Sequence, residues 1–278
     1  MSRADGVILW RGPSLIDGAP IVALAVGLAS GSSNRKTGSM LQTYILRDDL
    51  APTAAVKSGA DASICGDCPH RGDGTGGGRT CYVNVGQGPL GVWKAYKRGR
   101  YSAVPLTGMY CPIDGQYSLL YPGALADIGA GRNVRLGTYG DPAAIPSTVW
   151  HALVSRATGH TGYTHQWRHA LQLRGLCMAS VDTEAEAHEA HAAGWRTFRV
   201  TMPGAVARLE NEARCPASAE AGKKLQCAEC LACAGTARGL RGSIVIQAHG
   251  GFAVMANVGK RAARMLAASH SQPWSLTI

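Results

Sequence analysis

Seven of the nine cysteines in this chain fall into two groups whose spacing is typical of metal binding. The downstream group combines a Cys-x2-Cys-x2-Cys run, formed by Cys227, Cys230 and Cys233, with Cys215, which precedes Pro216. Successive thiolates on one short loop can each reach a different iron of a 4Fe–4S cube, and a remote Cys-Pro can supply the fourth ligand. Zinc more often takes two separate cysteine pairs. We expect these four cysteines to hold a closed 4Fe–4S cluster, with zinc as the alternative.

The upstream group lies in the stretch CGDCPHRGDGTGGGRTCYV and has the spacing Cys-x2-Cys-x12-Cys, formed by Cys65, Cys68 and Cys81. Two interpretations are open. In the first, His70 or the distant Cys111 completes a tetrahedral zinc site. In the second, the three thiolates hold a 4Fe–4S cluster and leave one iron open to a substrate or cofactor. The sequence also leaves open whether the two groups form one composite site or two separate sites.

The remaining features argue against disulfides and a membrane location. The N-terminal stretch MSRADGVILWRGPSL lacks the apolar core of a signal peptide. No apolar run reaches the ~18 residues of a membrane span. We therefore expect a soluble, cytoplasmic protein with reduced thiols and no membrane partner. Cys177 lies in the apolar stretch LCMASVD, where a small core residue is the simplest interpretation.

Ionisable side chains follow several predicted strands directly. Asp141 follows NVRLGTYG, His165 follows TGYT, and Asp182 follows CMASV. Because ligands bind at the carboxyl ends of parallel strands, these residues are candidate catalytic groups for proton transfer or substrate contact. Taken alone, Asp182 is better explained as the N-cap of a helix that begins at Thr183.

The elements that must position these groups indicate an α/β protein. Residues 1–60 predict N-terminal strands, residues 61–131 a cysteine- and glycine-rich insertion, and residues 132–278 a series of βα units that ends with the downstream cysteines. Strands that alternate with short helices favour right-handed crossovers and a parallel sheet. We expect one compact domain, a parallel (βα) barrel or partial TIM-like barrel with cysteine-rich metal-binding loops.

The chain is basic, with a formal net charge of +10 and a pI near 9.3. Its densest basic run is WKAYKRGRY, residues 93–101. Cations interleaved with aromatic rings can contact phosphates and stack on bases, so DNA or RNA is a candidate partner. The alternative is a solvated helix end whose aromatic side chains pack inward. The candidate nucleic-acid contacts are Lys94, Lys97, Arg98 and Arg100.

Together these motifs resemble the radical S-adenosylmethionine superfamily, in which a three-cysteine cluster lies near the start of a partial TIM barrel. The stretch TYGDPAAIP resembles that superfamily's Gly-Gly-Glu-Pro segment, which contacts the cofactor's amino group. The resemblance implies S-adenosylmethionine binding by Tyr139, Gly140, Asp141 and Pro142. The usual Cys-x3-Cys-x2-Cys motif is absent, and aspartate replaces the usual glutamate. The chain is also similar in style to uncharacterised cysteine-rich proteins of phages and plasmids.

Two functions follow as hypotheses. The first is an iron–sulfur, radical-SAM-like enzyme with one or two 4Fe–4S clusters that modifies a nucleotide or nucleic acid. The second is a nucleic-acid-binding protein with zinc-stapled loops, such as a replication or regulatory factor of a mobile element. A Ser/His/Asp hydrolase is a poor fit, since no Gly-x-Ser-x-Gly motif is present.

Overall fold

The structure is a computed structural model of the 278-residue chain. It describes residues 5–75, 77–104, 108–110, 117–119, 122–202, 208–222, 225–237, 239, 242–251 and 254–261. Cys111, one of the two proposed fourth zinc ligands, lies outside these ranges.

The first sheet has six strands in the order β4-β1-β2-β3-β7-β8. Strands β1 to β3 are antiparallel to their chain neighbours, whereas β7 is parallel to β3 and β8 is parallel to β7. A nearly unbroken apolar run, PIVALAV, makes β2 the buried centre of the antiparallel part. The strands are β1 (Gly6–Pro13), β2 (Pro20–Val26), β3 (Leu41–Arg47), β4 (Ser102–Ala103), β7 (Asn133–Tyr139) and β8 (Gly159–Thr161).

The second sheet has five strands in the order β12-β13-β11-β10-β9, and all its pairings are parallel. These strands are β9 (Tyr163–Thr164), β10 (Met178–Val181), β11 (Thr197–Thr201), β12 (Glu212–Arg214) and β13 (Ser243–Gln247). A separate hairpin pairs β5 (Gly108–Tyr110) with β6 (Tyr117–Leu119).

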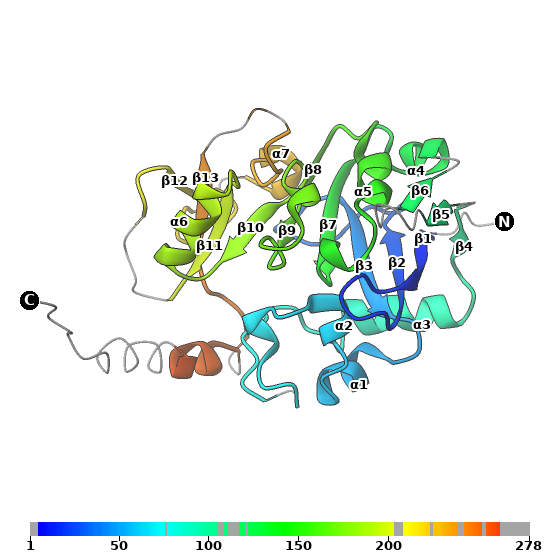
Figure 1. The fold of residues 1–278 in the computed structure, drawn as a ribbon, viewed down its shortest axis with the longest axis horizontal. Coiled ribbons are helices and arrows are strands. Elements are labelled where there is room, and N and C mark those ends of the chain that lie inside the picture. The colour runs from blue at the N-terminus through cyan, green and yellow to red at the C-terminus, as the bar shows by residue number, and fades with distance from the viewer. Residues whose placement is uncertain are drawn as a thin grey trace, which may run out of the picture.

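One short segment connects the two sheets. β8 and β9 follow each other with only Gly162 between them, and they belong to different sheets. A Cβ atom at Gly162 would lie 2.8 Å from the Cys177 sulfur, so a side chain does not fit there. The glycine lets the chain pass from one sheet to the other against the core. Figure 1 shows the two sheets side by side, with β8 and β9 at their junction.

The helices lie around these sheets. They are α1 (Pro52–Lys57), α2 (Ala62–Cys65), α3 (Gly88–Lys97), α4 (Pro122–Gly129), α5 (Ser147–Val154), α6 (Glu184–Ala192) and α7 (Cys227–Cys230). Three short 3-10 turns are η1 (Pro69–Arg71), η2 (Pro142–Ala144) and η3 (Leu171–Leu173), and residues 254–261 are also helical. In Figure 1, α1, α2 and α3 lie below the sheets, whereas α4, α5 and α7 lie above.

The main hydrophobic core covers the first sheet, α4, α5 and the first strands of the second sheet. Trp150 of α5 is completely buried there, and its Nε1 donates to the Pro142 carbonyl at 2.8 Å. Cys177 is also completely buried in this core, as its apolar neighbours predict.

The α/β class is confirmed, and the strands that alternate with helices are parallel to one another. The described strands form two open sheets rather than one closed barrel. None of the described helices combines the length and the apolar content that crossing a membrane requires.

Candidate functional site

The upstream cysteines converge at the carboxyl end of β7. Cys65 ends α2, Cys68 precedes η1, and the backbone N–H of Cys81 donates to the His70 carbonyl at 3.1 Å. The α2 turn joins β7 through the Asp141 N–H, which donates to the Ile64 carbonyl at 2.6 Å. Burial raises the pKa of Cys65 well above its ordinary value, and the nearby Cys68 and Cys81 raise it further. Three half-buried thiols therefore share one environment.

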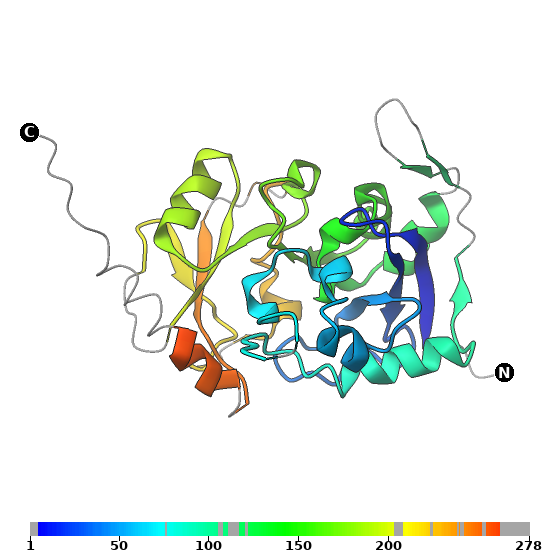
Figure 2. The same cartoon turned by 60° about the horizontal axis from the view of Figure 1, so that its bottom comes forward.

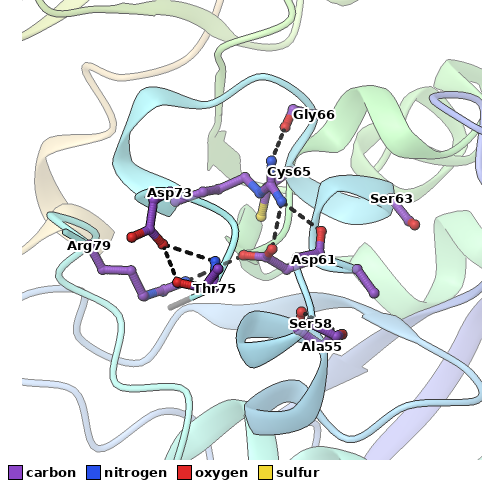
Figure 3. A network of polar contacts seen from close by, with 12 residues as sticks. Ala55, Ser58, Asp61, Ser63, Cys65, Gly66, Asp73, Thr75 and Arg79 are labelled. Atoms are coloured by element: carbon purple, nitrogen blue, oxygen red, sulfur yellow. Dashed lines mark hydrogen bonds and ion pairs between the residues drawn. The ribbon is translucent and has the colours of Figure 1, made fainter. Parts of the chain in front are cut away.

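A buried carboxylate fixes the loop that carries these thiols. Asp61 is 1% exposed and accepts from Arg71 at 2.7 Å and from Arg79 at 3.4 Å. Arg71 also donates to the carbonyls of Gly66 and Gly59, at 3.0 and 2.8 Å. Figure 3 shows Asp61 and Arg79 beside the Cys65 side chain. No motif in the sequence marked these three charged residues as part of a site. A signal exists in Cys-Pro-His-Arg, which puts an arginine three residues after a candidate ligand.

Asp141 is a hub of hydrogen bonds rather than an exposed carboxylate. Its side chain accepts from the Thr164 hydroxyl at 2.7 Å, from the His165 N–H at 2.8 Å and from the Ala143 N–H at 2.9 Å. Burial raises the pKa of Asp141 to about 6, although these hydrogen bonds lower it. Asp141 thus ties the end of β7 to the end of β9, and it holds His165 next to the cysteines.

The other residues of the predicted cofactor segment have structural roles in this turn. Gly140 has a φ of +85°, and a Cβ atom there would lie 2.6 Å from the Cβ of Ile45. Pro142 is buried at the start of η2. Tyr139 is 3% exposed, and its hydroxyl has no hydrogen-bond partner among the residues that the structure describes. Burial raises the pKa of Tyr139, and Cys65 raises it further, which places the hydroxyl near the thiols. An unpaired buried hydroxyl is unfavourable, so a partner from outside the described residues is expected here.

His70 and Asp182 form a second polar group beside the thiols. His70 Nε2 donates to Asp182 at 3.0 Å, and its Nδ1 accepts from the Thr80 hydroxyl at 2.7 Å. Arg261 of the helical segment 254–261 binds the other Asp182 oxygen at 3.0 Å. Burial alone would raise the pKa of Asp182, but His70 and Arg261 lower it to about 2. Both ring nitrogens of His70 are occupied, so His70 is not aimed at the cysteines as a zinc ligand would be.

The simplest expectation for Asp182, a helix N-cap, is wrong. The N-cap of α6 is Thr183, which forms a capping box with Glu186. The Glu186 carboxylate also accepts from the Asp182 N–H at 2.9 Å. The helix start therefore fixes the backbone at Asp182 and leaves its carboxylate to His70 and Arg261.

His165, and not His70, is the histidine that faces a cysteine. Its Nε2 lies 3.9 Å from the Cys68 sulfur. Burial lowers the pKa of His165 to about 4, and His70 lowers it further, so the imidazole is neutral at pH 7. Its ring also stacks edge-on with His70, with 5.5 Å between the ring centroids. The donor atoms of His70, His165 and Asp182 all lie within 4.8 Å of one another.

The thiols do not form a ready site for a single metal ion. Zn–S bonds of about 2.3 Å place tetrahedral thiolates roughly 3.8 Å apart. Among the described residues, the group of side chains close enough to hold one ion is His70, His165 and Asp182, and it includes no cysteine. In a 4Fe–4S cube each thiolate binds a different iron, so the ligands spread around a larger group.

The downstream cysteines converge at the opposite end of β7. The N–H groups of Cys227 and Ala228 donate to the carbonyls of Lys36 and Thr37, and the Ala228 carbonyl accepts from Asn133 at 2.8 Å. Leu231, with φ of +48°, lies between the third and fourth cysteines of the group and turns the chain sharply. The Cys233 carbonyl accepts from the Gly162 N–H at 3.0 Å. The loop therefore docks on β7 and on the junction of the two sheets.

The other three thiols of this group act on Cys233. Burial, together with Cys215, Cys227 and Cys230, raises the pKa of Cys233 to about 12. The upstream group lies at the carboxyl end of β7 and this group at its amino end. β7 has seven residues, and the six steps between them separate its two ends by roughly 20 Å. The structure therefore contains two separate cysteine groups and not one composite site.

The predicted nucleic-acid segment is the exposed end of α3. Tyr96 is buried and its hydroxyl donates to Asp48 at 2.7 Å, while Trp93 Nε1 donates to the Arg47 carbonyl at 3.1 Å. Lys97 binds the Asp48 carbonyl at 3.0 Å and lies over both rings. These two aromatic side chains pack inward and do not offer a base-stacking surface. The exposed cations that remain are Lys94, Arg98 and Arg100.

Comparison with protein-family models, with curated proteins and with solved structures finds no match to this chain. The function must therefore be inferred from the site itself.

Proposed function

We propose that this chain is an iron–sulfur enzyme of the radical-SAM type that acts on a nucleotide or nucleic acid. In this proposal Cys65, Cys68 and Cys81 hold a reactive 4Fe–4S cluster with one open iron. The downstream cysteines hold a closed auxiliary cluster. The observation that carries the proposal is the upstream site, where three thiols meet an unpartnered Tyr139 hydroxyl at the carboxyl ends of parallel strands.

The strand topology supports this proposal. β3, β7 and β8 are parallel in one sheet, β9, β10, β11 and β13 are parallel in the other, and Gly162 alone separates β8 from β9. A partial barrel needs such a succession of parallel strands, with its site at their carboxyl ends. Asp141, His165 and Asp182 all follow strands of this succession, and each lies within the upstream site.

The chain's own residues would organise the site around the cluster. An open cluster iron supplies a binding position for S-adenosylmethionine and an electron for its cleavage. Asp61 with Arg71 and Arg79 keeps the thiol loop in place. Neutral His165 offers an uncharged donor beside Cys68. Asp182 stays ionised above about pH 2 and keeps the His70 Nε2 proton directed at its carboxylate.

The test is metal analysis with a visible spectrum on protein purified without oxygen. We expect brown protein with about eight irons and eight sulfides per chain, as two 4Fe–4S clusters require. The triple variant C65S/C68S/C81S should keep about four irons, and so should the triple variant C227S/C230S/C233S. Because the groups are separate, each variant should leave the other cluster intact.

A second assay tests the chemistry. Reduced wild-type protein should cleave S-adenosylmethionine, and C65S/C68S/C81S should not. Colourless protein that contains only zinc would overturn the proposal in favour of the zinc-stapled nucleic-acid-binding protein. Cleavage that survives the upstream triple substitution would show that the reactive cluster is elsewhere.

A further inference from the structure

Three basic side chains, of which only Arg135 is buried, gather between the two cysteine groups. Arg135 projects from the amino-terminal half of β7, Lys36 comes from the loop before β3, and His249 follows β13. Lys36 Nζ donates to His249 Nε2 at 3.3 Å, and Arg135 lies near enough to help lower the pKa of Lys36, after the larger effect of burial. Tyr82, which directly follows Cys81, accepts a hydrogen bond from Arg135 and packs on His249, with 5.4 Å between the ring centroids.

These cations lack the carboxylate partners that buried charges normally have. Arg135 is only 8% exposed, and within the described ranges its Nε has no hydrogen-bond partner. No ion pair to Lys36, Arg135 or His249 occurs in the described part of the chain. Glu220 acts on Lys36 and His249 from a distance and forms no ion pair with either in the described ranges, and its Oε1 accepts from the Gln247 N–H at 2.8 Å. Burying a guanidinium without a counter-charge is costly, so an anion is expected here.

The cluster has an open side. Tyr82 is 51% exposed and His249 is also exposed, whereas Arg135 is buried beneath them. His249 Nδ1 donates to the Gln247 carbonyl at 3.1 Å, which leaves Nε2 as an acceptor for Lys36. A ligand that enters beside Tyr82 would meet the guanidinium, the ammonium and the tyrosine hydroxyl. Several donors that converge from different directions suit the three terminal oxygens of a phosphate better than the two of a carboxylate.

We propose that Arg135, Lys36 and Tyr82 form a binding site for a phosphate group of the substrate. The site lies between the two cysteine groups, since Tyr82 is adjacent to Cys81 and both cations act on Cys227. This deepens the proposed function by naming the substrate class, a phosphate ester, and it rests on that function for the link to the upstream cluster. The binding itself requires no reaction.

A competing role for the same cations is to balance the downstream thiolates. Four thiolates around a divalent metal or cluster core leave a net charge of about −2. Lys36 and Arg135 act on Cys227, and Arg196 lies near Cys233. The three positive charges of Lys36, Arg135 and Arg196 exceed the net charge of about −2 that they would balance. The unpartnered Nε of Arg135 and the exposed rim at Tyr82 favour an additional ligand.

The experiment is a calorimetric titration of the metal-loaded full-length protein with inorganic phosphate. We expect saturable binding that weakens by about 10- to 100-fold in Arg135→Gln and in Lys36→Gln, because each removes a charge-assisted hydrogen bond. Tyr82→Phe, an exposed and tolerant position, should weaken binding only a few-fold. The control is Arg156→Gln, since Arg156 forms an exposed ion pair with Asp127 at 2.7 Å, and it should bind as wild type does.

A second titration series identifies the source of the phosphate. Adenosine monophosphate should bind at least as tightly as inorganic phosphate, and adenosine should bind far more weakly. Equal affinity for phosphate in wild type and both cation variants would overturn the site. Loss of downstream metal from Arg135→Gln and Lys36→Gln, with no phosphate binding by wild type, would assign the cations to the thiolates instead. Wild-type protein that contains no iron when purified without oxygen, but still binds phosphate, would leave the site standing and overturn the proposed function.

Discussion

At the scale of single residues, the upstream site combines two carboxyl groups whose environments shift their pKa values in opposite directions. Burial raises the pKa of Asp141 to about 6, whereas burial is outweighed at Asp182 by His70 and Arg261, which lower its pKa to about 2. Such separation of two carboxyl groups is typical of functional sites. It also gives the protein a pH dependence that can be assigned to particular residues.

Asp182 should stabilise the fold only above strongly acidic pH. Its folded-state pKa of about 2 lies below its ordinary value of 3.8. Its contribution is therefore present above pH 4 and is lost as the pH falls through 2, and it amounts to roughly 2 kcal/mol. Urea unfolding should show Asp182→Asn clearly less stable than wild type at pH 5, with most of this difference gone at pH 2.

A stability difference between Asp182→Asn and wild type that stayed constant from pH 5 to pH 2 would contradict the assigned ion pair.

The opposite sign applies to Asp141, because burial raises its pKa. Asp141 contributes to the stability of the fold below pH 3.8, and this contribution is lost as the pH rises through about 6.

Tyr139→Phe should separate stability from function. The Tyr139 hydroxyl is buried without a partner, so its removal should stabilise the metal-free protein by about 1 kcal/mol. The matched control is Tyr96→Phe, because the Tyr96 hydroxyl is hydrogen-bonded to Asp48 at 2.7 Å and its loss should destabilise by a similar amount. Thermal unfolding of both variants measures this contrast. If Tyr139→Phe destabilises as much as the control, the hydroxyl has a partner within the protein.

At the scale of elements, β7 is the feature that organises both cysteine groups. Its carboxyl end carries Tyr139 and leads to Asp141, which binds the α2 turn, and its amino end carries Asn133, which binds the α7 loop. Figure 2 gives a second view of the segments around this strand, with helix 254–261 beside the upstream loop. Asn257 of that helix donates to the Arg79 carbonyl at 2.9 Å. A single strand thus holds the two groups at a fixed separation.

Gly162→Ala tests the junction between the sheets. The added Cβ would lie 2.8 Å from the Cys177 sulfur and 3.2 Å from the Leu136 Cβ. We expect a loss of about 1–3 kcal/mol in unfolding free energy from overpacking. Adding Cys177→Ala should recover part of it, because the closest atom is then removed. Gly123→Ala in α4 is the control, since nothing lies within 4 Å of its Cβ position and alanine favours a helix. Denaturant titration of wild type, Gly162→Ala, the Gly162→Ala/Cys177→Ala double variant and Gly123→Ala measures these differences. An unchanged unfolding midpoint for Gly162→Ala would show that the junction has room to relax.

At the scale of the whole molecule, the formal charge of +10 remains a reason to expect a polyanionic partner. Lys97 at the end of α3 is paired with Asp48. The other exposed cations here are Lys94 in α3 and Arg98 and Arg100, which directly follow it. The aromatic rings beside them pack inward, so any contact made by this segment would be with phosphates and would not read sequence.

Replacing Lys94, Arg98 and Arg100 together by glutamine should weaken binding to a DNA or RNA oligonucleotide. If each contacts one phosphate, the slope of log K against log salt should fall by roughly 2–3. Lys97→Gln is the control and should change little, because Lys97 already binds Asp48 at 3.6 Å. Fluorescence anisotropy at several salt concentrations measures both. An unchanged slope in the triple variant would remove α3 from any nucleic-acid interface.

The sequence by itself determined the α/β class and the members of each cysteine group. Both depend on local information, because a Cys-x2-Cys spacing fixes which thiols share a loop and alternating elements fix the class. It also indicated that Asp141 and His165 each follow a strand at its carboxyl end, where parallel strands place their ligand-binding groups.

Only the tertiary structure decided how distant residues pair. In the tertiary structure the two cysteine groups lie at opposite ends of β7. His165, rather than His70, lies next to Cys68. The Asp182 carboxylate binds His70 and Arg261. The tertiary structure also brought Lys36, Arg135, Tyr82 and His249 together from four distant segments. These contacts join residues tens to hundreds of positions apart, and no local periodicity or spacing encodes which side chain completes another's hydrogen bonds.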